Sequence, residues 1–166
     1  SQKFGHESEY ERKTAHVTAI AETEGLQFNY DKQSVSPNTR NAHRLVLLSK
    51  ENNKHLEMVE ALFRAYFTDG IDLSKQENLL DIAVNVGLDR TKTDLFLRSD
   101  IGTAEVAMAE QELHKMGISG VPFYIINDKY GISGAQATET FVEAITNIGK
   151  ELSQAAEVCD VDKKNC

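Results

Sequence analysis

The stretch that decides the fold is GVPFYII, residues 120–126. Pro122 opens a run of strand-forming residues, yet a proline cannot donate a hydrogen bond to a sheet and is therefore confined to sheet edges and strand starts. The turn-forming residues 127–129 come next, and residues 130–133 can return as a second strand. We therefore expect a β-hairpin over residues 121–133, and the proline at its start needs a specific reason.

The segments on both sides of this hairpin are predicted to be helical, because their apolar residues recur at intervals of three and four. After the hairpin, residues 138–150 predict a final helix, and residues 151–166 are predicted to be a polar tail. Before it, residues 37–116 predict an almost wholly helical block. Two start signals lie in or next to this block: Ser36 as N-cap before Pro37, and a capping box of Ser74 and Glu77. The helices expected in the block cover residues 37–51, 54–68, 74–86, 91–98 and 102–116.

The first thirty residues predict one helix and one strand. Residues 7–24 carry apolar side chains at roughly helical spacing, and Gly25 follows as a C-terminal cap. Residues 26–30, LQFNY, alternate apolar and polar side chains, which is typical of a half-buried strand. The chain as a whole is therefore a helical block between a short strand and a strand–strand–helix unit.

Composition bounds the class of protein. The 166 residues are 40% hydrophobic and 27% charged, which is typical of one folded domain with a real core. A formal net charge of −8 argues against nucleic acid or an anionic membrane as partner, because phosphates would be repelled. No apolar stretch approaches the roughly 20 residues that cross a bilayer, and the first residues do not follow a signal-peptide pattern. We expect a cytoplasmic protein.

Several separated stretches resemble the FrnE-like branch of the DsbA family. They are residues 117–123, residues 130–136, Asn38 and Thr39 with residues 42–45, and residues 62–67. In that branch a helical domain is inserted into a thioredoxin fold. The resemblance therefore implies an α/β thioredoxin-like fold with a large all-helical insertion. Residues 1–36 and 117–150 would form the thioredoxin-like part, and residues 37–116 the insertion.

The resemblance also gives the proline a role. In thioredoxin-fold proteins a cis-proline at this position faces the active site and leaves the backbone of the preceding residue free to pair with substrate. This implies that Pro122 and Val121 belong to the catalytic site, with Gly120 beside them in contact with substrate. The alternative is that Pro122 is an edge-strand proline whose only role is shape.

One departure from the family pattern concerns the nucleophile. Family members carry a Cys-Pro-x-Cys-type motif at a helix N-terminus, where the thiolate is stabilised. Nothing in this chain corresponds to that motif, and about the first quarter of the family pattern is absent. We expect the nucleophilic cysteine to lie outside this chain, which starts at Ser1. This chain alone should then be inactive in disulfide exchange.

Four residues at the start of the helical block are further candidates. By the resemblance, His43 and Arg44 face the cleft, where a cation could lower the pKa of a thiol or hold an acidic group of the substrate. A solvated helix face explains them equally simply. Asn38 and Thr39 are candidate substrate contacts, or they serve only to start the helix. The aromatic residues 63, 66 and 67 either pack between helices or line an apolar cleft between the helical block and the thioredoxin-like part, suited to an extended or aromatic substrate.

Cys159 and Cys166 are the only cysteines. They are candidate redox residues that could form a loop-closing disulfide, resolve another thiol or stay reduced, but their spacing is not Cys-x-x-Cys. The histidines are scattered and zinc-type spacing is absent, so we predict no metal and no cofactor, with glutathione as a conceivable co-substrate.

The sequence thus predicts a DsbA-like thiol-disulfide oxidoreductase or isomerase that exchanges disulfides with a protein or small thiol substrate. Two alternatives remain open. One is a glutathione-dependent isomerase or transferase of the kappa-like branch, in which serine replaces the cysteine. The other is a non-enzymatic module that binds a peptide or small molecule. Neither nucleic acid nor membrane is expected as a partner, and a homodimer is a candidate assembly.

Overall fold

The computed structural model describes residues 3–33 and 35–161. The chain divides into two compact units, residues 1–110 and residues 111–166, which we call unit 1 and unit 2. The division falls inside a helix. The predicted grouping of residues 1–36 with residues 117–150 in one thioredoxin-like part stays a prediction, because residues 1–36 lie here in the same compact unit as most of the helical block.

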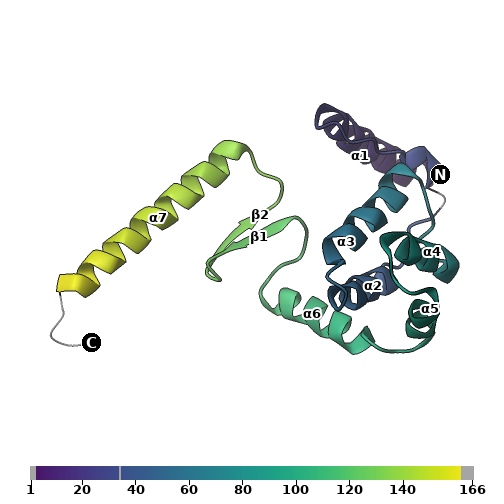
Figure 1. Cartoon of the computed structure of the whole chain (residues 1–166). Helices are drawn as coiled ribbons and strands as arrows, with labels where there is room; N and C mark the ends of the chain where they lie inside the picture. The colour runs from purple at the N-terminus through teal and green to yellow at the C-terminus, as the bar shows by residue number, and fades with distance from the viewer. Residues whose placement is uncertain (1–2, 34, 162–166) are drawn as a thin grey trace. The chain divides into compact units, whose positions relative to one another are not determined.

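Unit 1 is built from helices, as expected for the block upstream of the hairpin. Figure 1 shows α2 to α5 gathered together in this unit. Asp89 caps α5 by accepting a hydrogen bond of 2.8 Å from the backbone N–H of Lys92. The elements in chain order are α1 (Lys3–Thr23), the 3₁₀ turn η1 (Tyr30–Lys32), α2 (Arg40–Lys50), α3 (His55–Phe63), the π-helical turn η2 (Arg64–Thr68), α4 (Gln76–Val86), α5 (Arg90–Arg98) and α6 (Thr103–Lys115).

The core of unit 1 lies between α2, α3, α4 and α5. Leu45, Met58 and Leu79 come from three of these helices and are each 0% exposed. The apolar stripes that predicted amphipathic helices therefore meet in one cluster, because each helix can bury its stripe only against its neighbours. The buried members of the cluster are Ala42, Leu45, Met58, Leu62, Ala65, Leu73, Leu79, Leu80, Ile82, Ala83, Leu88 and Leu97.

The predicted strand at residues 26–30 is wrong. Residues 26–29 belong to no helix or sheet, and the 3₁₀ turn η1 follows them. The backbone N–H of Asn29 donates to the carbonyl of Phe67 (2.7 Å), and the Thr68 hydroxyl donates to the carbonyl of Gln27 (2.9 Å). These hydrogen bonds attach the segment to the end of η2. It forms no strand, because no described strand lies beside it to form a ladder.

Both predicted helix-start signals are also wrong. α2 begins at Arg40, after the Ser36 and Pro37 that were expected to start it, and α4 begins at Gln76 without a capping box. The Ser74 hydroxyl donates to Asp72 Oδ1 (2.6 Å) and so closes a turn before the helix. Serine and aspartate side chains compete for local backbone and side-chain partners, which makes such signals ambiguous between caps and turns.

Gly70 allows the loop after η2 to pass close to η1. Its φ is +70°, and a Cβ at this position would collide with Lys32 Cβ and lie 3.0 Å from the Lys32 carbonyl carbon. We expect Gly70→Ala to lower the free energy of unfolding by about 2–3 kcal/mol, from left-handed strain plus overlap. Equilibrium urea denaturation followed by circular dichroism measures this loss.

The matched control for Gly70→Ala is Gly25→Ala. Gly25 has a φ of +74°, but its Cβ would meet nothing within 4 Å. We expect this variant to lose only about 1–2 kcal/mol, the cost of the left-handed conformation alone. Equal losses in the free energy of unfolding for the two variants would show that the close approach of Lys32 does not contribute to the cost of Gly70→Ala.

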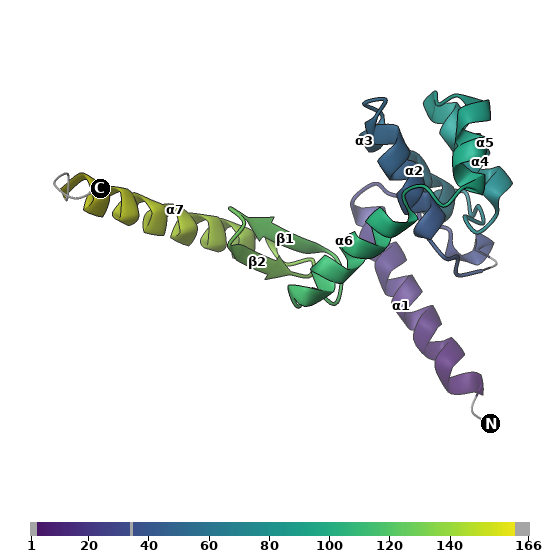
Figure 2. The ribbon, with the colours of Figure 1, turned by 90° about the horizontal axis from the view of Figure 1, so that it is seen from below.

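Unit 2 contains the expected hairpin and a long helix. β1 (Phe123–Ile126) pairs antiparallel with β2 (Tyr130–Ser133), with Phe123 opposite Ser133, and Figure 2 shows the two strands side by side. Asn127 and Asp128 have φ values of 52° and 55°, and the N–H of Lys129 donates to the carbonyl of Ile126 over 3.2 Å. These two residues are the central positions of a tight turn within the three-residue loop 127–129. β1 starts after the proline, so the first two residues of the predicted strand lie outside the ladder.

α7 (Thr138–Val161) follows the hairpin and covers the predicted final helix. The Phe141 ring packs edge-on against Tyr124 of β1, with 4.9 Å between ring centroids. The helix continues past Lys150 to Val161, so the predicted end of this helix at residue 150 is wrong, while the polar tail of residues 151–166 stays a prediction. Polar residues with good helix propensity, such as Glu, Lys and Gln, extend a helix that packing has started. None of the described helices combines the length and the hydropathy needed to cross a bilayer.

Candidate functional site

The turn that enters the hairpin has an unusual backbone. The Val121–Pro122 peptide bond is cis, and the carbonyl of Pro122 accepts a hydrogen bond of 2.8 Å from the N–H of Gly134. Val121 is 91% exposed, and its backbone has no hydrogen-bond partner among the described residues. Gly120 beside it is also exposed. The turn therefore exposes a backbone N–H and carbonyl that bond to no other described residue.

A polar cluster in unit 2 fastens the hairpin turn to α7. Lys129 Nζ lies 2.8 Å from Glu151 Oε1, and the Tyr130 hydroxyl donates to Glu151 Oε2 over 2.6 Å. The hydrogen bond from Lys129, followed by that from Tyr130, lowers the pKa of Glu151. The same bond to Glu151 is the main cause that raises the pKa of Lys129. These hydrogen bonds are exposed to solvent. Their arrangement holds the hairpin turn in place and gives no indication of a chemical step.

In unit 1, His43 and Thr39 lie on one face of α2 and line an apolar groove. We call this the α2–α3 groove; its volume is about 280 Å³. Both residues were predicted to contact substrate, and the structure brings them together on one rim. The groove is lined by Thr39, Ala42, His43, Val46, Val59, Leu62, Phe63, Tyr66, Phe67 and Leu73.

Arg44 does not face that groove, so the prediction of a substrate contact is corrected. It is 3% exposed, and its guanidinium donates to the carbonyls of Phe96 (2.8 Å), Ser99 (2.6 Å) and Ile101 (2.8 Å). The last carbonyls of a helix have no partner within the helix, and a buried arginine can satisfy several of them at once. Arg44 therefore caps the end of α5. Residues 43 and 44 are adjacent on α2 and so point in different directions, which is why one is exposed and the other buried.

Asn38 serves the start of α2. Its Oδ1 accepts a hydrogen bond of 2.9 Å from the backbone N–H of Arg40, which is the helix-start role considered beside substrate binding. Thr39 occupies the N-cap position, but its side chain makes no capping hydrogen bond. The hydroxyl of Thr39 is thus available at the rim of the α2–α3 groove.

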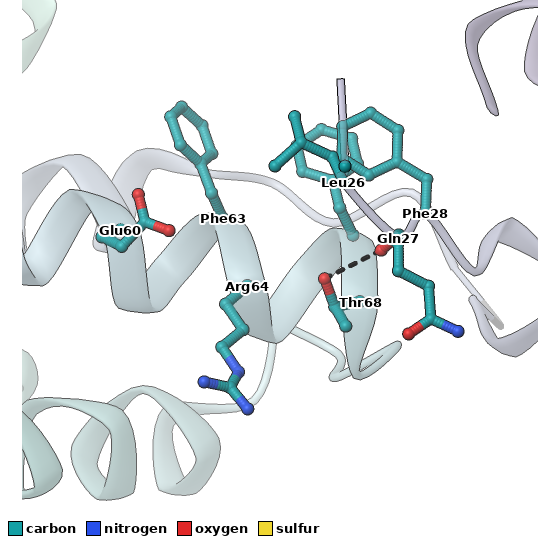
Figure 3. Close-up of a pocket in the computed structure, with 9 residues that line it drawn as sticks. Leu26, Gln27, Phe28, Glu60, Phe63, Arg64 and Thr68 are labelled. Carbon is teal, nitrogen blue, oxygen red and sulfur yellow. Dashed lines mark hydrogen bonds between the residues drawn. The ribbon is translucent and has the colours of Figure 1, made fainter. Parts of the chain in front are cut away.

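A second groove of about 450 Å³ shares Phe63 and Phe67 with the α2–α3 groove. We call it the Phe28 groove. In Figure 3, Leu26, Phe28 and Phe63 lie on one side of the helix and Arg64 points to the other, and the dashed line joins Thr68 to Gln27. The Phe28 ring stacks on Phe67 with centroids 4.7 Å apart. The groove is lined by Gly25, Leu26, Gln27, Phe28, Glu60, Phe63, Arg64, Phe67 and Thr68.

The aromatic residues at 63, 66 and 67 pack on one another and line grooves within unit 1, and the predicted cleft against the thioredoxin-like part stays a prediction. Phe67 packs against Tyr66, with 4.9 Å between centroids, while Phe63 is 58% exposed between the two grooves. The π-helical turn η2 follows Phe63 and contains the other two rings. Such turns are rare and often occur at functional sites. The sequence analysis missed Val46, Val59 and Leu73 as groove residues, although 39, 42, 43 and 46 share the spacing of one helix face.

The two cysteines stand differently in the structure. Cys159 belongs to the backbone of α7, and its side chain lies outside the part that the structure describes. Cys166 lies outside the described residues altogether. Among the described residues, no group of three or more His, Cys, Asp or Glu side chains could hold a metal ion.

The comparisons with known proteins agree with one another. The family model of the DSBA-like thioredoxin domain matches residues 6–146. The uncharacterized protein YwbO of Bacillus subtilis (strain 168) is 30% identical over 139 residues, which cover 81% of this chain and 68% of that protein. The crystal structure of a probable DsbA oxidoreductase from Streptomyces coelicolor matches with a TM-score of 0.77 and 30% identity over 90% of this chain. This chain spans 65% of that solved chain.

The predicted fold class is confirmed by the family match and by the solved relative. Residues 40–115 are largely helical, and the two-stranded hairpin and α7 follow them. The family model covers most of the chain, and both relatives reach 30% identity. The chain therefore belongs to the family of the DSBA-like thioredoxin domain.

Proposed function

We propose that this chain is the substrate-contacting part of a FrnE-like DsbA oxidoreductase that exchanges disulfides with a protein or small thiol substrate. Family membership supports the reaction class. The observation that carries the finer proposal is the exposed Val121, whose backbone has no partner among the described residues. An extended substrate chain can pair with such a backbone as it would with a strand edge.

The proposed reaction needs a cysteine outside this chain. Its thiolate attacks one sulfur of the substrate disulfide, a new S–S bond forms, and the other substrate sulfur leaves as a thiolate that takes up a proton. A second thiol then attacks the mixed disulfide and releases the first substrate sulfur. In this proposal Val121 and Pro122 position the substrate, Gly120 gives it room, and no metal or cofactor takes part. Cys159 and Cys166 stay candidate redox residues, and the enzyme is cytoplasmic.

The test uses the full-length gene product. Its intact mass and N-terminal sequence are determined first, and its insulin-reduction rate is then compared with that of the 166-residue chain. We expect a longer chain with a Cys-x-x-Cys motif that turns over insulin, and no turnover by the 166-residue chain. A full-length product that has no such motif and no turnover would overturn the proposal.

Removing the backbone N–H of Val121 tests its positioning role. Val121→Pro in the full-length protein is expected to lower the rate of insulin reduction at least tenfold, because a substrate strand loses a hydrogen-bond donor. The matched control is Thr138→Pro at the first residue of α7, where a helix accommodates proline. The control should keep full activity, and thermal melts should show both variants folded. Full activity of a folded Val121→Pro enzyme would contradict backbone pairing.

One observation favours a second function. The α2–α3 groove is an apolar pocket built by unit 1 alone, without any cysteine. A non-enzymatic module that binds a peptide or small molecule would retain ligand binding in the absence of thiol turnover. Turnover that depends on glutathione, with serine in place of the cysteine, would instead support the kappa-like branch. A homodimer remains a candidate assembly, to be checked by light scattering.

A further inference from the structure

The α2–α3 groove is formed by two helix faces turned toward each other. Thr39, Ala42, His43 and Val46 lie three and four residues apart on α2, and the residues from Val59 to Phe67 that line the groove have the same spacing along α3 and η2. Leu62 and Leu73 are buried at 6% and 5% exposure, so the groove floor is the core of unit 1. Its shape is therefore set by the best-packed part of the unit.

The size of the groove limits what it can hold. Its volume is about 280 Å³, and an apolar cavity of roughly 150 Å³ is enough to bind benzene. The α2–α3 groove therefore accommodates one or two fused rings. It is too small for a helix of a partner protein, whose diameter with side chains is about 10–12 Å.

One wall of the groove is aromatic. Phe67 lies edge-on to Tyr66 with 4.9 Å between ring centroids, and 6.0 Å from the ring of the exposed Phe63. Aromatic rings favour edge-to-face and offset-stacked neighbours, which gives an aromatic ligand an advantage over an aliphatic ligand of equal area. Val46 on α2 and Val59 on α3 add aliphatic side chains to the lining.

The polar end of the groove consists of donors. The lining of the groove contains one histidine, His43, and no Asp, Glu, Lys or Arg. The chain as a whole carries a net charge of −8. An imidazole donates at least one N–H in either protonation state, and the hydroxyl of Thr39 can donate as well. An anionic oxygen would therefore meet hydrogen-bond donors here and no carboxylate of the lining.

We propose that the α2–α3 groove binds a small aromatic carboxylic acid of one or two rings. The ring lies between Val46 and the aromatic wall, and the carboxylate accepts hydrogen bonds from His43 and Thr39. The site belongs to unit 1, so binding does not depend on the proposed disulfide exchange.

The first experiment titrates the 166-residue chain with 2-naphthoate and follows the fluorescence of the naphthalene ring, since the chain contains no tryptophan. The same titration with neutral 2-naphthylmethanol tests the carboxylate. We expect saturable one-to-one binding of 2-naphthoate, and at least fivefold weaker binding of the alcohol. An absence of saturable binding, or equal affinity for both probes, would overturn the proposal.

Paired variants then locate the bound probe. His43→Gln should weaken 2-naphthoate binding at least fivefold, whereas His55→Gln, at the exposed start of α3, should leave it unchanged. Val46→Glu should weaken it at least tenfold by placing a carboxylate in the groove, and Leu26→Glu in the Phe28 groove should not. Thermal melts check that each variant is folded. His43→Gln alters an exposed side chain, so it tests the proposal even if Val46→Glu unfolds. Loss of binding in Leu26→Glu with full binding in His43→Gln would refute it.

Discussion

Arg44→Met is expected to lower the free energy of unfolding by about 3–5 kcal/mol, a loss typical of a broken buried charge network. Arg44 makes five hydrogen bonds, four of them to backbone carbonyls between residues 96 and 101 and one to Asn41 Oδ1. Its guanidinium also lies 4.9 Å from the centroid of the Phe96 ring. Methionine fills the space but satisfies none of these acceptors, and a buried carbonyl without a partner costs about 1–3 kcal/mol.

Equilibrium urea denaturation followed by circular dichroism measures this loss, and Arg40→Met is the matched control. Arg40 begins α2 and is exposed, so this change should stay within about 0.5 kcal/mol. Arg44→Lys tests whether the planar guanidinium group is needed, because an ammonium group cannot reach carbonyls on several sides at once. We expect this variant to lose nearly as much stability as the methionine variant. A stable Arg44→Met protein would mean that water replaces the guanidinium at the end of α5.

Leu79→Ala is expected to lower the free energy of unfolding by about 3–4 kcal/mol. Leu79 of α4 is 0% exposed and belongs to the core cluster of unit 1. Truncation removes the transfer free energy of the side chain and leaves a cavity that its neighbours fill only in part. The measurement is again the urea midpoint, converted with a slope that should not change between variant and parent.

The matched control for this core truncation is Leu56→Ala. Leu56 of α3 is 71% exposed, so the same chemical change should cost less than about 0.5 kcal/mol. The contrast separates burial from helix propensity, since leucine and alanine are both good helix formers. Similar losses at both positions would show that the free energy of unfolding is not concentrated in this core.

The helices could be predicted from the sequence because their signal is local and repeated. Each expected helix of residues 37–116 occurs within a few residues of its predicted bounds, since an apolar stripe over ten residues outweighs any single ambiguous residue. The hairpin could also be predicted from the sequence, because Asn127 and Asp128 can adopt the positive φ that this tight turn requires. The first residues of the helices were harder to predict, since Ser36 and Ser74 can close a turn as readily as they can cap a helix.

The candidate site could be predicted from the sequence only in part. The sequence singled out His43 and Arg44 together, and only packing separates them, because successive residues on a helix point about 100° apart. His43 reaches the rim of the α2–α3 groove while Arg44 is buried against the end of α5. The strand expected at residues 26–30 failed for a related reason. Strand pairing needs a partner distant in the chain, and no local pattern supplies one.

The sequence by itself therefore determined the helical block, the hairpin and the place of the Val121–Pro122 turn, because each depends on periodicity or on the covalent limits of proline and turn residues. The fold class followed from the resemblance of several separated stretches to the DsbA family. Only the tertiary structure decided which polar side chains bind backbone and which face a groove. That choice depends on contacts such as those of Arg44 with residues 96–101, more than fifty positions away in the chain. Burial of a charge is favourable only where such acceptors converge, and their convergence is a property of packed helices.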